Sequence, residues 1–157
     1  MSLPTDPKEL TLTAMMSVFV FIATFVPKIP IPLGYAHLGD AAIFLIVIYC
    51  GRCVGITSGI IGSALADLLS GFPIWIVPTI FIKAAMAETF YRLREKNFII
   101  SLILACLVMT AGYTIFGAVI YESLSAGLTS TPGLLAESVI NIAVTLILYS
   151  ALKNKLK

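Results

Sequence analysis

Charged residues are scarce in this chain and stand between long apolar stretches, and this restricts its fold more than any other feature. Only 11% of the 157 residues are charged, whereas 59% are hydrophobic. A soluble domain of this size needs a charged surface, so the pattern indicates an integral membrane protein. A spanning helix takes roughly 17–25 apolar residues, which leaves room for about six spans and almost nothing else. We therefore expect one all-α transmembrane domain over residues 1–157, a compact bundle of six transmembrane helices.

Prolines, glycines and charges divide the apolar sequence into runs. Three prolines and a glycine at 27–34 (PKIPIPLG) cannot continue a helix, so they end the first run. A stretch rich in Ser, Gly, Thr and Pro at 123–133 leads to the last run. The first run lacks the basic start and the cleavage site of a signal peptide, so we interpret it as a retained helix. The predicted helices cover residues 10–26, 40–51, 53–69, 74–91, 98–121 and 134–152.

The second run is too short to cross a full bilayer, so its separation from the third run decides the topology. Joining the two would place Arg52 near the bilayer centre, at a cost of at least roughly 2.5 kcal/mol. With six helices and both the N and C termini cytoplasmic, Arg52 reaches a membrane surface and Lys28 lies outside. The cytoplasmic side then holds Lys8, Arg52, Arg92, Arg94, Lys96, Lys153, Lys155 and Lys157. This excess of basic residues inside favours the six-helix topology.

Small residues follow one face of the predicted third helix. They recur every four residues as Gly51, Gly55, Gly59 and Ser63, with Gly62 and Ala66 beside them. Such a stripe lets helix backbones approach closely. It suits packing inside the bundle, and alternatively a docking surface for another membrane subunit. A shorter flat patch on the first helix contains Ala14 and Ser17, with Val18 where a second alanine would lengthen it.

Motifs for several kinds of chemistry are missing from the sequence. We find no G-x-x-x-x-G-K-[ST] phosphate-binding motif and no Cys/His metal cluster, so we expect neither ATP hydrolysis nor a metal site nor a cofactor. Cys50 and Cys53 have C-x-x-C spacing, but no βαβ pattern surrounds them, and we interpret them as small residues at a helix end. If the protein moves a solute, another component supplies the energy.

Polar residues inside the predicted spans carry most of the functional information. Lys83 lies roughly 15 Å deep, where a lysine needs a partner or a wet cavity. Glu137 and Asn141 are four residues apart and share a helix face. Further polar or aromatic residues in the outer half are Asp67, Trp75, Tyr113 and Tyr121. Their similar depth predicts an outward-opening cavity for a small polar ligand.

Each of these residues also has a structural interpretation. Trp75 and Tyr121 suit anchors in the aromatic belt of the membrane, and Asp40 suits a helix N-cap. Lys83 suits a purely structural ion pair with Glu137 or Asp67.

Three segments together resemble a known family. They are YAHLGDA at 35–41, GRCVG at 51–55 and GSALADLLSG at 62–71, and the similarity continues through IKA at 82–84 to the end of the chain. These segments resemble the substrate-binding S components of energy-coupling factor (ECF) vitamin transporters. The chain length, the six helices and the cytoplasmic termini agree with that family.

The resemblance implies a multi-pass subunit of a bacterial cytoplasmic membrane that captures a vitamin or its precursor and is not an enzyme. Its implied partners are a transmembrane coupling subunit and two ATPase subunits, with delivery by toppling in the membrane. The family docks through Ala-x-x-x-Ala on the first helix, where this chain has candidate docking residues Ala14, Ser17 and Val18.

The resemblance also implies a pocket formed by helices four to six and covered by the loop after the first helix. Lys83, Tyr113, Glu137 and Asn141 would line it, with His37 in the covering loop. Together with the residues singled out above, the candidate substrate-binding set is His37, Asp67, Trp75, Lys83, Tyr113, Glu137 and Asn141.

The character of these residues favours a small substrate. A pocket with a lysine, acids and few aromatics suits a small hydroxylated heteroaromatic better than a large flavin, so we favour pyridoxine or the hydroxymethylpyrimidine precursor of thiamine. S components for riboflavin, pantothenate or thiamine are the alternatives within the family. Rivals from other classes are a non-transporting structural or assembly subunit, and a membrane enzyme using Asp67 or Glu137 as acid/base, which no paired-carboxylate or metal motif supports.

Overall fold

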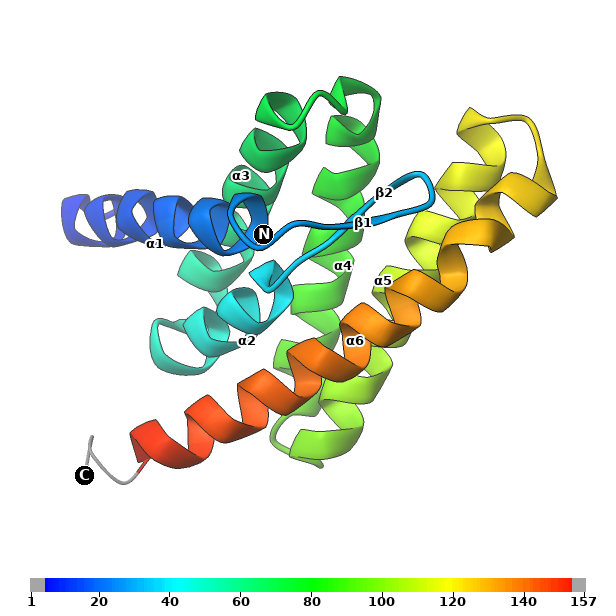
Figure 1. The fold of residues 1–157 in the computed structure, drawn as a ribbon. Helices are drawn as coiled ribbons and strands as arrows, with labels where there is room; N and C mark the ends of the chain where they lie inside the picture. The colour runs from blue at the N-terminus through cyan, green and yellow to red at the C-terminus, as the bar shows by residue number, and fades with distance from the viewer. Residues whose placement is uncertain (1–4, 154–157) are drawn as a thin grey trace.

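A computed structural model describes residues 5–153, which form six α-helices and one short β-hairpin (Figure 1). Lys155 and Lys157, which the topology argument places on the cytoplasmic side, lie outside the described residues. The elements in chain order are α1 (Pro7–Phe25), β1 (Ile29–Ile31), β2 (Gly34–Ala36), α2 (Gly39–Tyr49), α3 (Gly51–Leu69), a 3₁₀ turn (Pro73–Trp75), α4 (Ile76–Leu93), α5 (Phe98–Ile120) and α6 (Leu124–Lys153).

The proline-rich break after α1 folds into the antiparallel hairpin β1–β2, which the sequence did not predict. Ile29 pairs with Ala36, and Ile31 pairs with Gly34. The turn between the strands uses Leu33 in the left-handed region, at φ 63°. Proline cannot donate a backbone hydrogen bond, but this two-stranded hairpin belongs to no larger sheet whose hydrogen bonds a proline would interrupt. The hairpin covers a space that is lined by residues of α3, α5 and α6.

The separation of α2 from α3 is confirmed. The chain reverses at Cys50 and Gly51, and Gly51 adopts φ +87°, which favours glycine. Arg52 follows this turn and donates to both carboxylate oxygens of Glu88 on α4, at 2.7 and 3.0 Å. Helix α2 has 11 residues, about 16 Å of helix, which is too short to span a bilayer. The other five α-helices are long and apolar enough to cross a membrane.

Helix α6 starts ten residues earlier than the sequence predicts, at Leu124 instead of 134. It includes Pro132, which cannot donate a helical hydrogen bond and normally interrupts a helix. Close packing against α5 supports this part of the helix, because a Cβ on Gly127 would lie 2.8 Å from the backbone nitrogen of Ala118. The expectation that the last helix begins only after 123–133 was therefore wrong, because tertiary packing outweighs the composition of this stretch.

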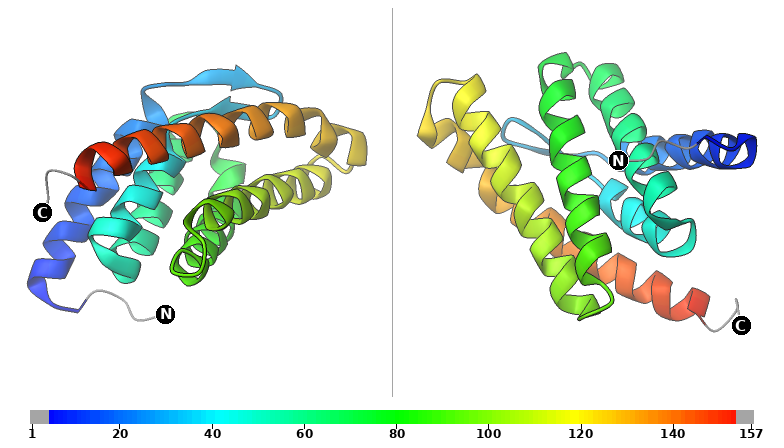
Figure 2. Two further views of the ribbon diagram at one scale, coloured as in Figure 1. Left: turned by 90° about the horizontal axis from the view of Figure 1, so that it is seen from below. Right: turned by 180° about the vertical axis from the view of Figure 1, so that it is seen from behind.

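The helices α1, α3, α4, α5 and α6 pack side by side in that order, and α2 lies among α1, α3, α4 and α6 (Figures 1 and 2). Every residue of α2 from Gly39 to Val47 is buried. The ring of Phe44 packs against Phe90 of α4 at 4.9 Å between centroids. The short helix α2 is thus the centre of the core.

The small-residue stripe of α3 packs inside the bundle. Gly55 and Gly59 face α2, and Gly62 faces α1. A Cβ on Gly62 would lie 2.6 Å from the carbonyl oxygen of Ser17 and 2.7 Å from Cβ of Val20. The stripe therefore serves close approach of α1 and α2 to α3, as in the packing interpretation.

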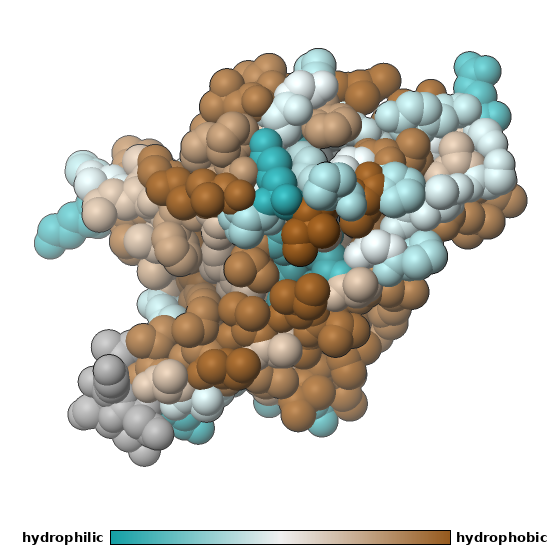
Figure 3. Space-filling model, viewed as in Figure 1, coloured by the Kyte–Doolittle hydropathy of each residue, from teal (hydrophilic) through white to brown (hydrophobic). Residues whose placement is uncertain are grey.

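The outer surface of the bundle is apolar, as expected for contact with lipid chains. Large hydrophobic side chains such as Phe81, Ile115 and Val139 are more than 60% exposed. Figure 3 shows brown apolar surface over much of the molecule, with pale and teal polar residues gathered in the upper middle and right of this face. With five helices able to span, the fold is that of a multi-pass membrane protein.

Candidate functional site

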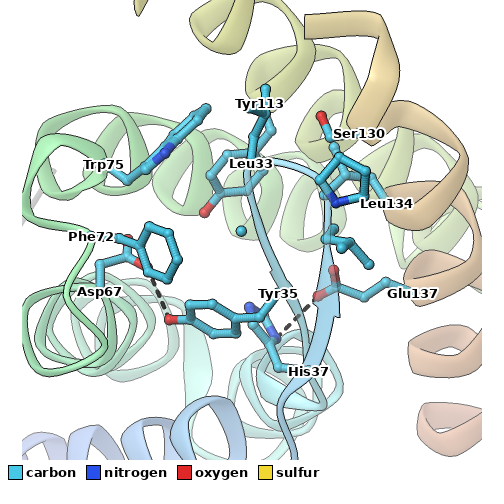
Figure 4. Close-up of a pocket in the computed structure, with 13 residues that line it drawn as sticks. Leu33, Tyr35, His37, Asp67, Phe72, Trp75, Tyr113, Ser130, Leu134 and Glu137 are labelled. Atoms are coloured by element: carbon cyan, nitrogen blue, oxygen red, sulfur yellow. Dashed lines mark hydrogen bonds and ion pairs between the residues drawn. The ribbon is translucent and has the colours of Figure 1, made fainter. Parts of the chain in front are cut away.

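A pocket lies between the hairpin β1–β2 and the neighbouring parts of α3, α4, α5 and α6 (Figure 4). Its cavity volume is about 50 Å³, and the empty space including the open mouth is about 500 Å³. The side chains that give it chemical character are Tyr35, His37, Asp67, Phe72, Trp75, Tyr113, Ser130 and Glu137. The pocket thus combines aromatic rings with two carboxyl groups.

Tyr35 fixes the hairpin on α3 at the mouth of the pocket. Its hydroxyl donates to Oδ1 of Asp67 at 3.0 Å, and the hydroxyl of Ser70 donates to it at 3.4 Å. Burial and the Asp67 carboxylate both raise the pKa of Tyr35, so it remains a neutral donor. The ammonium group of Lys28 lies 3.7 Å from the ring centroid of Phe25 and 5.1 Å from that of Tyr35.

A chain of hydrogen bonds continues from Asp67 along the pocket wall. Thr79 donates to Oδ2 of Asp67 at 2.5 Å. The hydroxyls of Thr79 and Tyr113 are 3.1 Å apart. Because both oxygens of Asp67 already accept hydrogen bonds, this carboxylate also has a structural role in joining the hairpin, α3, α4 and α5.

Aromatic rings form much of the wall. Trp75 packs against Tyr113 at 5.6 Å between ring centroids, and Tyr35 packs against Phe72 at 5.8 Å. The side chain of Trp75 is only 6% exposed, so its interpretation as a membrane-belt anchor was wrong. Sequence reasoning expected few aromatics and missed Tyr35 and Phe72. Tyr35 stands in the YAHLGDA segment, which was a usable signal, whereas nothing in the sequence marked Phe72.

Lys83 lies behind the pocket wall and pairs with Asp40. The two side chains are 1% and 0% exposed, and the ammonium group of Lys83 donates to Oδ1 of Asp40. Asp40 is therefore an ion-pair partner and not an N-cap, because the N-cap of α2 is Leu38, and this helix has no side-chain cap. The expected pairing of Lys83 with Glu137 or Asp67 was also wrong. Lys83 is not among the residues that line the pocket.

Asn141 also lies behind the wall, fully buried. Its side-chain oxygen accepts from the backbone N–H of Ala41 at 2.8 Å. Its side-chain nitrogen donates to the carbonyl oxygens of His37 at 2.8 Å and Glu137 at 3.0 Å. The amide of Asn141 thereby holds the segment between β2 and α2 against α6, and it has no hydrogen atom left for a ligand.

His37 and Glu137 form the inner end of the pocket. Nδ1 of His37 lies 3.1 Å from Oε1 of Glu137, and the side chains are 9% and 3% exposed. The backbone N–H of Gly39 donates to the same Nδ1 at 3.1 Å. Burial, and next the charge of Lys83, lower the pKa of His37 to about 4. His37 is therefore a neutral imidazole at physiological pH.

The three candidate docking residues on α1 divide into two groups. Ala14 and Val18 are exposed on one face of the helix. Ser17 is buried against α3, and its hydroxyl donates to the carbonyl oxygen of Thr13 at 2.7 Å. Only Ala14 and Val18 are thus accessible to another protein.

Comparisons with known proteins agree with this architecture. Residues 5–154 match the model of a family described as ECF-type riboflavin transporter, S component. A solved structure of the S component of a bacterial ECF transporter is similar with a TM-score of 0.79 and 25% identity, covering 96% of this chain and 98% of that chain. A protein of Pyrococcus woesei, described as "Uncharacterized protein in gap 3'region", is 33% identical over 109 residues, which are 65% of this chain and 73% of that protein.

Proposed function

Because the chain belongs to the family of ECF-type riboflavin transporter S components, we propose that the pocket beneath its hairpin captures a flat, hydroxylated heteroaromatic vitamin. The protein is a multi-pass subunit of the cell membrane. Its family and fold are those of a substrate-binding transporter subunit and not of an enzyme. The observation that carries the proposal is the aromatic pocket with its two carboxyl groups.

Riboflavin is our first candidate substrate. The rings of Tyr35, Phe72, Trp75 and Tyr113 offer faces and edges against which a flat ring system packs favourably. Carboxyl and hydroxyl groups beside them suit the hydroxyls of a ribityl chain. The family description supports the same candidate.

Pyridoxine and the hydroxymethylpyrimidine precursor of thiamine are the second candidates. They are favoured by the small cavity volume, about 50 Å³. Riboflavin would require the hairpin to move outward, whereas a single six-membered ring requires a smaller movement. A vitamin with a free carboxylate, such as pantothenate, fits less well, because the residues that line the pocket include Asp67 and Glu137 but no lysine or arginine.

The proposed ligand contacts are His37, Asp67, Trp75, Tyr113 and Glu137, which all line the pocket. Lys83 and Asn141 act from behind the wall. Their ion pair and hydrogen bonds fix the positions of α2, α4 and α6.

We propose further that a transmembrane coupling subunit and two ATPase subunits energise uptake. The sequence has no phosphate-binding motif of its own, so ATP-driven uptake would draw its energy from a partner. The accessible part of the α1 patch, at Ala14 and Val18, is the candidate docking surface.

Fluorescence of Trp75 offers a direct test, because it is the only tryptophan in the chain and lines the pocket. The purified protein in detergent is titrated with riboflavin, pyridoxine, hydroxymethylpyrimidine, thiamine and pantothenate. We expect saturable quenching by one flat heteroaromatic. Tyr113→Leu should weaken that binding, whereas Tyr49→Leu, at a partly exposed helix end, should not. If no vitamin binds, and native mass spectrometry finds no co-purified small molecule, the chain is a structural or assembly subunit instead.

A further inference from the structure

The indole N–H of Trp75 is a hydrogen-bond donor without a partner in the pocket wall. Among the residues that the structure describes, no group accepts from Nε1, and this atom is buried on a side chain that is only 6% exposed. Nearly all buried polar atoms in folded proteins have a partner, so this exception needs an explanation. Because Trp75 lines the pocket, a bound ligand is in a position to supply the missing acceptor.

The polar groups in the adjoining part of the wall are already paired with one another. Oδ1 of Asp67 accepts from the hydroxyl of Tyr35, and Oδ2 accepts from the hydroxyl of Thr79. The hydroxyl of Tyr113 lies 3.1 Å from that of Thr79. The network that joins the hairpin to α3, α4 and α5 is therefore complete without Trp75, and the N–H of this residue remains available.

Neighbouring rings and the local backbone hold the indole in place. The ring centroids of Tyr113 and Tyr121 lie 5.6 and 6.5 Å from that of Trp75. Trp75 ends the 3₁₀ turn before α4, and its backbone N–H donates to the carbonyl oxygen of Phe72 at 3.0 Å. A donor that is already fixed loses little conformational freedom when a ligand binds, so its hydrogen bond contributes more fully to affinity.

The tip of the hairpin lies beside the same part of the wall. Cδ1 of Leu33 and Cη2 of Trp75 are each 3.5 Å from the point where a Cβ on Gly117 of α5 would stand. Leu33 and Trp75 both line the pocket. The outward movement of the hairpin that a ring-shaped ligand requires would therefore take Leu33 away from Trp75, and the ring of the ligand would lie where Leu33 is now.

We propose that the N–H of Trp75 binds a hydrogen-bond acceptor in the ring of the vitamin and thereby selects the ligand. The proposal rests on the proposed function and deepens it. An indole N–H donates and cannot accept, so the ring edge that meets Trp75 carries an unprotonated ring nitrogen or a carbonyl oxygen. A C–H or N–H at that edge would leave buried polar groups unpaired, and a site built around a hydrogen bond rejects such ligands strongly.

The position of Trp75 also sets the orientation of the ligand. Figure 4 shows Trp75 and Glu137 on opposite sides of the pocket. The flat ring packs favourably against the aromatic side chains around Trp75, such as Tyr113. The vitamin therefore binds with the acceptor edge of its ring toward Trp75 and with its hydroxyl-bearing substituent toward Glu137.

Magnetic resonance of the wild-type protein tests the hydrogen bond directly. Trp75 is the only tryptophan, so proton–nitrogen spectra contain one indole N–H signal. The protein in detergent is titrated with riboflavin, pyridoxine and hydroxymethylpyrimidine, and with analogues that replace one ring nitrogen by C–H or one ring carbonyl oxygen by sulfur. We expect the vitamin that binds to move the indole proton downfield, and one analogue that still binds to lose this shift. Equal shifts with the vitamin and all its binding analogues would overturn the proposal.

Calorimetry with the same ligands tests whether the hydrogen bond determines specificity. In wild type, replacing the acceptor that meets Trp75 should weaken binding about tenfold. Trp75→Phe keeps an aromatic ring but has no N–H, so the same replacement should change its affinity by less than about twofold. The matched control is Tyr121→Phe, because Tyr121 packs on Trp75 but does not line the pocket. This variant should discriminate between the ligands as wild type does.

The outcomes separate this proposal from the proposed function. A vitamin that binds, but whose analogues lose the same affinity in wild type and in Trp75→Phe, overturns the role of Trp75 and leaves the proposed function intact. If Trp75→Phe does not fold, the indole signal of the wild-type protein decides alone. Failure of every vitamin to bind the folded wild type overturns the proposed function itself, and the role of Trp75 with it.

Discussion

Replacing Lys83 by methionine should destabilise the protein strongly without altering the binding site. The change leaves the carboxylate of Asp40, 0% exposed, without its cation, and Oδ2 of this carboxylate has no partner even in the native protein. Breaking a buried ion pair costs about 3–5 kcal/mol. In a chain of this size each kcal/mol corresponds to about 2–4 °C in melting temperature. We therefore expect the melting temperature to fall by about 6–20 °C.

Melting curves in detergent measure this effect, and a double variant isolates its cause. Lys83→Met combined with Asp40→Asn removes both charges, so it should recover most of the loss. Lys8→Met, at an exposed position, makes the same chemical change and should melt like wild type. Binding by the folded fraction of Lys83→Met should remain within about twofold of wild type, because Lys83 does not line the pocket.

Two results would refute this reasoning. Normal melting of Lys83→Met together with affinity weakened about tenfold would make Lys83 a ligand contact and not a structural cation. A double variant that melts as low as Lys83→Met would show that the stranded charge of Asp40 is not what destabilises the single variant.

Three further predictions concern topology, docking and packing. Cysteine-accessibility labelling should find position 28 (Lys28) outside and position 52 (Arg52) inside; both on one side would contradict the six-helix topology. Ala14→Trp should abolish uptake and leave ligand binding intact, because the ring prevents close approach of a partner helix to α1; unchanged uptake would place the docking surface elsewhere. Gly62→Ala should lower the melting temperature, since its Cβ would lie 2.6 Å from a carbonyl oxygen of α1, whereas Gly34→Ala, whose Cβ meets no atom within 4 Å, should not.

The overall architecture could be predicted because the membrane restricts the sequence so strongly. Each spanning helix needs a long apolar run, and each run here ends at prolines, glycines or charges. The energetic cost of placing Arg52 inside the membrane correctly predicted that α2 and α3 are separate helices. The turn between them, at Gly51, places Arg52 at a helix end. The fold of the bundle thus followed from hydropathy and a few charges.

The outer part of α6 and the hairpin could not be predicted, because their stability comes from contacts distant in sequence. The composition of 123–133 favours a loop, yet Gly127 packs on α5 and the hydroxyls of Thr114 and Thr131 meet at 2.9 Å. The hairpin has strands of three residues each and is held on α3 by the bond of Tyr35 to Asp67. Neither the packing of α6 on α5 nor the bond of Tyr35 to Asp67 leaves a pattern in the neighbouring sequence. Local propensities alone therefore predict the wrong structure for both segments.

For the site, the position of each polar residue in its apolar run predicts its depth in the membrane, but not the group with which it forms a hydrogen bond or ion pair. Lys83, Asn141 and Glu137 lie at similar depth, and all three were expected to meet the ligand. In the structure, Lys83 is satisfied by Asp40, and Asn141 by backbone groups of α2 and the preceding loop, 100 and 104 residues away. Glu137 alone of the three retains an oxygen that no protein group supplies with a donor. Glu137 also lines the pocket, whereas Asp40, whose Oδ2 is likewise unpartnered, does not, so Glu137 is the one of the three that we propose as a ligand contact.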